Sequence, residues 1–84
     1  MKPNEILKQQ FLEIVDNQLD SNDPPETRQT LERLKKEGYS DADARLLIAQ
    51  CVAAEMFNVM KHNEPYNSKR YVSNLNALPE PPSE

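Results

Sequence analysis

The residues that could carry out chemistry in this 84-residue chain are few and scattered. Histidine is the usual general base and the commonest metal ligand, yet His62 is the only histidine and Cys51 the only cysteine. Gly38 is the single glycine, so neither a phosphate-binding loop nor a dinucleotide fingerprint can be built. We therefore expect no enzymatic activity and no cofactor.

Carboxylates and amides are the remaining candidates for ligand binding. Asp16 and Asp20 are i, i+4 neighbours, and Asp23 follows them, so these carboxylates could hold a hard cation. A calcium loop, however, needs ligands at alternating positions followed by glycine, and no glycine follows here. The pattern therefore favours capping and solvation for this acidic group over a metal site.

Three other polar residues are weak ligand candidates beside Asp16. Gln18 falls on an apolar stripe, which favours a buried amide that caps a neighbouring helix end. Glu55 lies between Ala54 and Met56, and we expect it to pair with Arg45 or Lys69 or to reach solvent. His62 is near a predicted helix end, where the helix dipole explains its presence.

The element that must position these residues is a central helix from Asp41 to Lys61, the longest apolar segment of the chain. Its pattern predicts a broad core-facing side opposite Gln50, Glu55, Asn58 and Lys61. That predicted core face consists of Leu46, Ile48, Ala49, Val52, Ala53, Met56, Phe57, Val59 and Met60.

Three small or apolar residues fall in the more polar half of this helix. They are Leu47, Cys51 and Ala54, so this half is not plainly solvated. They could contact another helix of the same chain or a second subunit, and the sequence leaves both alternatives open. We treat them as a candidate interface.

Three further helices are expected around the central one. Pro3 suits the start of the first, whose stripe includes Leu7, Phe11, Ile14, Val15 and Leu19 and which ends at Asp20–Asp23. Asp23 is the expected N-cap of the second helix, and Gly38 its C-terminal cap.

Capping patterns also mark the later helices. Ser40 with Asp43 predicts the start of the central helix, and Asn67 that of the last. We expect an all-α fold, a compact four-helix arrangement with short second and last helices. It forms a single domain over residues 1–78, with a disordered proline-rich tail over 79–84.

Composition and charge restrict the partners and the compartment. A formal charge of −4 disfavours nucleic acid and anionic membranes, since both recognise basic surfaces. The central helix is too short and too interrupted by charge for a membrane span, and the N-terminus lacks a signal-peptide pattern. A single cysteine fits a reducing compartment, so we expect a cytoplasmic protein.

Several short motifs resemble those of a known group. The chain is similar to small all-helical bacterial proteins classed as a domain of unknown function, over roughly Lys8 to Leu78. The matching segments are Ile14–Leu19, Asp23–Glu26, Leu31–Leu34 and Glu37–Tyr39. The resemblance implies the helical fold and a bacterial cytoplasmic setting.

Relatives in that group carry i, i+4 histidine pairs, a spacing that could present imidazoles to a metal. The matching positions here are Lys8 with Leu12 and Ala42 with Leu46, so no metal site is carried over.

Two hypotheses of function follow. The first is a noncatalytic helical protein that self-associates or binds a protein partner through apolar helix surface. The alternative is a metal- or small-ligand-binding helical domain that uses Asp16, Gln18, Glu55 and His62.

Overall fold

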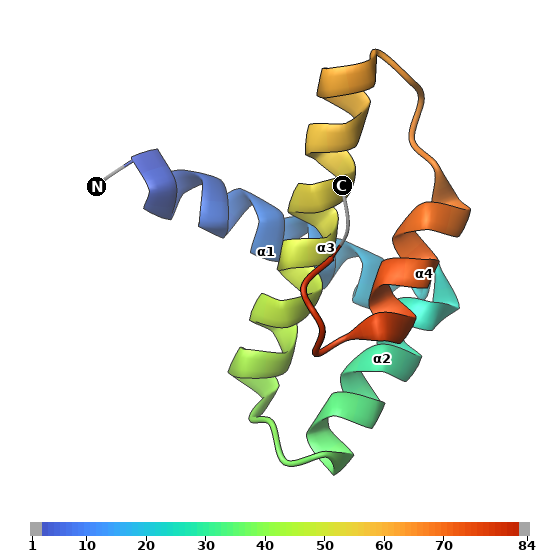
Figure 1. Ribbon diagram of the computed structural model, residues 1–84. Helices are drawn as coiled ribbons and strands as arrows, with labels where there is room; N and C mark the ends of the chain where they lie inside the picture. Colours follow the sequence, from blue (N-terminus) through green and yellow to red (C-terminus); the bar gives the residue numbers. More distant parts are fainter. Residues whose placement is uncertain (1–2, 83–84) are drawn as a thin grey trace.

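Four helices make up the described chain, as the sequence predicted. A computed structural model describes residues 3–82, with side chains from residue 7 onward. The helices are α1 (Pro3–Ser21), α2 (Pro25–Lys36), α3 (Asp41–His62) and α4 (Ser68–Ala77), and no strand occurs within this range. Helix α3 contacts all three others, and α2 also contacts α1 and α4 (Figure 1). The central position predicted for α3 is therefore confirmed.

Helices α1, α2 and α3 end where residues with left-handed backbone close their last turns. Gly38 has φ +106°, its N–H donates to Lys35 O, and the Tyr39 N–H donates to Leu34 O, both over 3.1 Å. These two bonds define a Schellman motif, and the half-buried Tyr39 packs against the core. Asn22 and Asn63 take positive φ at the ends of α1 and α3. The predicted glycine cap of α2 is thus confirmed.

Two of the three predicted N-caps are also confirmed. Ser40 Oγ accepts a bond from the Asp43 N–H at the start of α3, and Asn67 Oδ1 accepts one from the Arg70 N–H at the start of α4. The predicted Asp23 cap is wrong, because Pro24 occupies the N-cap position of α2 and no side chain caps it. Arg28 on α2 instead donates to Leu19 O and caps the C-terminal end of α1.

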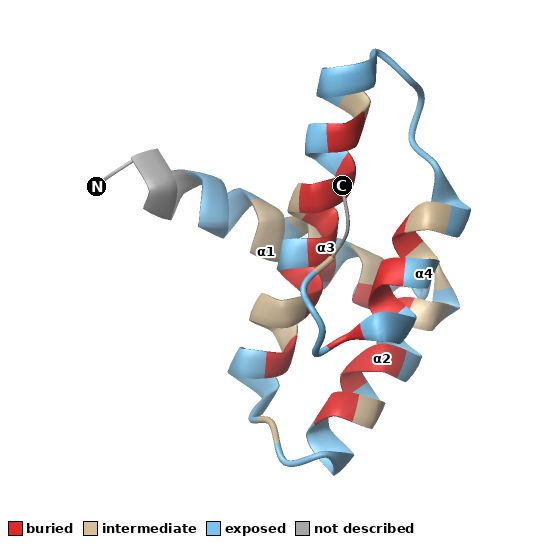
Figure 2. Cartoon of the chain, in the orientation of Figure 1, coloured by how far each residue is buried: buried red, intermediate tan, exposed pale blue. Residues whose placement is uncertain are grey.

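The core lies where α1, α2, α3 and α4 meet. Its fully buried members include Val15, Leu34, Ile48 and Leu75, and Tyr71 is the largest. Figure 2 shows buried residues gathered in this region, while the end of α3 and the loop to α4 are exposed. The N-terminal half of α1 extends away from the other helices (Figure 1), which leaves Leu7 49% exposed.

The core-facing side predicted for α3 is wrong in part. Met56, Phe57 and Met60 were expected inside, but they are among the exposed apolar side chains. Glu55 and Asn58 were expected on the polar side, yet they are 3% and 2% exposed. Helix α3 is therefore turned so that part of its polar half faces inward, and the reason is the hydrogen bonding described below.

The chain after α4 does not continue the helix. Arg33 Nη1 donates to Leu78 O over 2.9 Å and Nη2 donates to Leu75 O over 3.0 Å, so α2 caps the C-terminal end of α4. Leu78 is buried, and residues 79–82 follow without helix. Residues 83 and 84 of the predicted tail lie outside the described range, so its disorder stays a prediction.

Replacing Gly38 tests the closing turn of α2. A Cβ at Gly38 meets no atom within 4 Å, so the cost of Gly38→Ala comes from the positive φ alone. We expect a loss of about 1–2 kcal/mol in the free energy of unfolding, measured by urea denaturation. Lys36→Ala, exposed in the last turn of the same helix, is the control and should change it by less than about 0.5 kcal/mol. An unchanged Gly38→Ala stability would contradict the left-handed turn.

Candidate functional site

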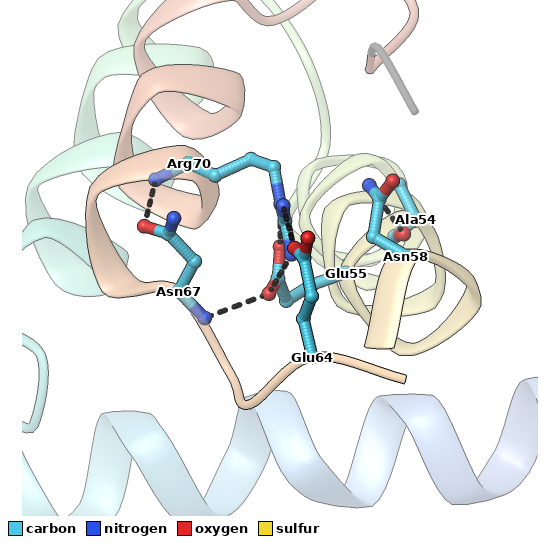
Figure 3. Close-up of polar contacts among 6 residues, drawn as sticks. All are labelled: Ala54, Glu55, Asn58, Glu64, Asn67 and Arg70. Carbon is cyan, nitrogen blue, oxygen red and sulfur yellow. Dashed lines mark hydrogen bonds and ion pairs between the residues drawn. The ribbon is translucent and has the colours of Figure 1, made fainter. Parts of the chain in front are cut away.

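A buried carboxylate joins α3 to α4 and to the loop between them. Arg70 binds Glu55 with two parallel bonds, from Nε to Oε1 over 2.7 Å and from Nη2 to Oε2 over 2.8 Å (Figure 3). The Asn67 N–H donates to Glu55 Oε2 over 2.8 Å, so the residue that caps α4 also contacts this carboxylate. We call Glu55, Asn67 and Arg70 the clasp.

The clasp satisfies a charge that burial alone would make costly. The Glu55 side chain is 4% exposed, and Arg70, at 23%, keeps part of its surface in water and reaches Glu64 over 3.6 Å. The hydrogen bonds from Arg70 hold the pKa of Glu55 below its ordinary value, despite the opposing effect of burial. Glu55 is therefore held ionised with both oxygens bonded. The expected pairing with Arg45 or Lys69 is wrong.

A second polar group faces inward beside the clasp. Asn58, one turn after Ala54, donates from Nδ2 to Ala54 O over 3.1 Å (Figure 3). A buried amide that bonds to its own helix keeps this face of α3 compatible with the interior. The contacts of Glu55 with α4 and its loop orient the C-terminal half of α3, and the Asn58 bond allows the same face to be buried.

Gln18 links three helices through one oxygen. Its Oε1 accepts bonds from Thr27 Oγ1 over 2.8 Å and from the Tyr71 hydroxyl over 2.7 Å. Burial raises the pKa of Tyr71 to about 12, so this hydroxyl stays protonated. The amide was predicted to be buried and to cap a helix end. It is half-buried and instead bonds to side chains of α2 and α4.

The four ligand candidates do not converge on one site. Gln18 and Glu55 both line a cavity of about 330 Å³, whose walls are mainly apolar. Asp16 lies elsewhere, exposed and paired with Arg45, which also binds Asp41. His62 is exposed at the end of α3. Among the side chains that the structure describes, from residue 7 to residue 82, no group of three or more His, Cys, Asp or Glu residues is placed to hold a metal ion.

The residues proposed from sequence as an interface are mostly covered by the chain itself. Cys51 is fully buried and Ala54 is 6% exposed, while Leu47 is half-buried against the core. Desolvation raises the pKa of the Cys51 thiol to about 12. For Cys51 and Ala54, contact within one chain is observed, and they offer no free surface. Leu47 keeps part of its side chain exposed, so a subunit contact at this residue stays a prediction.

Apolar surface is exposed on the opposite side of α3. Phe57 is 57% exposed, Met60 74% and Met56 46%. At ~100° per residue, six positions share this side within an arc of about 100°. We call them the outer stripe: Leu46, Ala49, Ala53, Met56, Phe57 and Met60. The exposed part is the C-terminal half, because Ala49 is 6% exposed and packs in the core, and Leu46 and Ala53 are half-buried.

An open groove borders the N-terminal half of this stripe. Its volume is about 410 Å³, and it lies between α1 and α3. The α1 side consists of Leu7, Lys8 and Phe11, and the α3 side of Leu46, Ala49, Gln50 and Ala53. Small side chains on α3 therefore leave space beside an apolar wall.

Comparisons with known proteins identified no relative of this chain. No protein-family model, no curated protein and no solved structure matches the chain. The resemblance to a bacterial helical group of unknown function therefore stays a prediction. Within the described range, no helix has the combination of length and hydrophobicity needed to cross a membrane.

The sequence pattern missed Arg70, the main partner of Glu55. Arg70 follows Glu55 by fifteen positions and lies in another helix, so no helical spacing connects them. The only available signal was a carboxylate set among apolar residues of α3, which indicates a buried charge in need of a partner. Candidate cations after Pro65 include Arg70 as well as Lys69.

Removing the buried carboxylate should be costly. Glu55→Ala leaves Arg70 and the Asn67 N–H without their acceptor, and we expect it to lower the free energy of unfolding by about 2–4 kcal/mol. Glu64→Ala is the matched control, because Glu64 is 55% exposed and should contribute less than about 0.5 kcal/mol. Equal effects of the two substitutions in urea denaturation would contradict the clasp.

The clasp should also appear in the pH dependence of stability. The pKa of Glu55 is lower in the folded chain than its ordinary value of 4.5, so the unfolded chain binds more protons in this range. The stabilisation is complete above about pH 5 and is lost as pH falls through the folded pKa. We expect the free energy of unfolding of Glu55→Gln to fall less steeply below about pH 5 than that of the wild type. Glu64→Gln should show the same pH dependence as the wild type. An unchanged pH dependence in Glu55→Gln would be the contrary result.

Proposed function

We propose that this protein is a noncatalytic interaction protein that self-associates through the outer stripe of α3. The observation that supports the proposal is the exposure of Met56, Phe57 and Met60 on consecutive turns of a helix whose Glu55 and Asn58 are buried. Single exposed apolar residues are ordinary, but adjacent large ones on one face are typical of binding surfaces.

The choice of a second copy as partner is supported by the shape of the stripe. Its C-terminal half carries large, flexible or aromatic side chains, and its N-terminal half carries Ala49 and Ala53 beside the groove. One chain therefore offers both the protruding and the receiving apolar surface. Most soluble oligomers are symmetric assemblies of one chain, which requires a self-complementary surface of this kind.

The polar candidates give less support to the ligand-binding alternative. Both Glu55 oxygens and Gln18 Oε1 are already bonded within the chain. Asp16 and His62 lie apart from the cavity that Gln18 and Glu55 line. The interaction proposal needs no rearrangement of these contacts.

Sedimentation equilibrium from about 5 to 200 µM tests the proposal. We expect the wild type to dimerise and Phe57→Glu to shift toward monomer, since a central aromatic side chain often contributes 2 kcal/mol or more, about thirtyfold in the dissociation constant. The helical circular dichroism should not change, because Phe57 is 57% exposed.

Gln29→Glu is the matched control, because it adds the same charge at an exposed position of α2. It should associate like the wild type. A wild type that stays monomeric up to 200 µM would contradict self-association, and equal loss of dimer in both variants would place the interface elsewhere.

A further inference from the structure

We propose that the two copies pair their α3 helices antiparallel about Ala53, so that the large half of each outer stripe covers the small half of the other. This inference rests on the self-association proposed above and adds its orientation, its register and the residues that decide it.

The register follows from the order of large and small residues. In an antiparallel pair centred on Ala53, a residue a given number of positions before Ala53 in one copy faces the residue the same number of positions after Ala53 in the other. Met60 then faces Leu46 of the second copy, Phe57 faces Ala49, and Met56 faces Gln50. Small residues let the helices approach closely, and the large side chains fill the space above them.

The groove gives the large side chains a place to lie. It borders Leu46 and Ala53, which are half-buried, and Ala49, which is 6% exposed. This is the half of the stripe that Phe57 and Met60 of the second copy would cover. Leu7, which is 49% exposed, and Phe11 supply the opposite wall. The volume of about 410 Å³ therefore lies on the side where this register places the protruding residues.

Charge at the edge of the stripe agrees with the antiparallel register. Asp43 and Lys61 are eighteen positions apart, which is five full turns, so they lie on the same flank of α3. In the proposed dimer a twofold axis relates the two α3 helices, which run in opposite directions and present the same flank on the same side of the dimer. Asp43 of one copy therefore lies within about 3 Å, measured along the helix axis, of the level of Lys61 of the other.

Both groups are available for such a contact. Asp43 and Lys61 are exposed, and among the side chains described, those of residues 7–82, neither forms an ion pair. Antiparallel pairing therefore forms two symmetric ion pairs at the edges of the apolar contact. Parallel pairing would instead bring the large halves to one level and the alanines to another, which leaves space unfilled.

Cysteine crosslinking tests the register directly. In a Cys51→Ala background, Leu46→Cys and Met60→Cys are prepared separately, one with nitrogen-15, and mixed before mild oxidation. We expect the mixed disulfide to exceed either self-linked product by about tenfold or more. In each homodimer the identical cysteines would be about 21 Å apart along the helix, too far for a disulfide.

Each of the other outcomes would contradict the proposed register, and they differ in whether self-association through the outer stripe is also contradicted. Self-linked products in excess would show parallel pairing and leave self-association standing. No crosslink from a wild type that does dimerise would place the contact away from the stripe. No crosslink from a monomeric wild type would overturn the proposed function as well.

Charge reversal provides a second readout without cysteine. Asp43→Lys and Lys61→Asp should each raise the dimer dissociation constant, by roughly three- to tenfold at low salt, because each creates like-charge contacts. Mixed together, the two variants should form heterodimers as tightly as the wild type. Glu32→Lys, exposed on α2, is the control and should change little. Mixing without recovery would overturn the register.

Discussion

The buried ion pair between Glu55 and Arg70 is the constraint on which the arrangement of α3 depends. A carboxylate that is 4% exposed is tolerated only when its oxygens are bonded, and here Arg70 and the Asn67 N–H supply all three bonds. Because Asn67 also caps α4, one interaction fixes the rotation of α3, the course of the loop and the start of the last helix. The rest of the fold is built around that geometry.

The rotation has a direct consequence for the surface. A helix that turns Glu55 and Asn58 inward must turn its opposite side outward, and that side carries Met56, Phe57 and Met60. Glu55 and Phe57 are about 160° apart around the helix axis (shorter way), so they cannot share one face. The polar contact thus stabilises the single chain and at the same time leaves apolar area for a partner. Exposure of this kind is costly to solubility unless another surface covers it.

Local signals in the sequence predicted the helices well. Ser40, Asn67 and Gly38 act through hydrogen bonds to backbone groups a few residues away, so their roles can be read from spacing alone. The wrong prediction at Asp23 is also a local one, because the N-cap of α2 is Pro24, one residue after the position that we expected.

The orientation of α3 could not be read in the same way. A periodicity argument assigns charged and amide residues to water, which is wrong for Glu55 and Asn58 because their partners compensate the loss of hydration. Arg70 belongs to another helix and has no spacing signal. Small residues such as Cys51 and Ala54 then fill the interior where larger ones were expected, and the large residues remain outside.

The rotation of α3 is tested most directly by covalent footprinting with mass spectrometry, at a concentration low enough to keep the chain monomeric. Carbodiimide-activated amine labelling reports the accessibility of carboxylates, and brief peroxide treatment reports that of methionines. The structure predicts slow labelling of Glu55 relative to Glu64 and rapid oxidation of Met60, which is 74% exposed. Labelling of Glu55 at the rate of Glu64, with Met60 protected, would contradict the account.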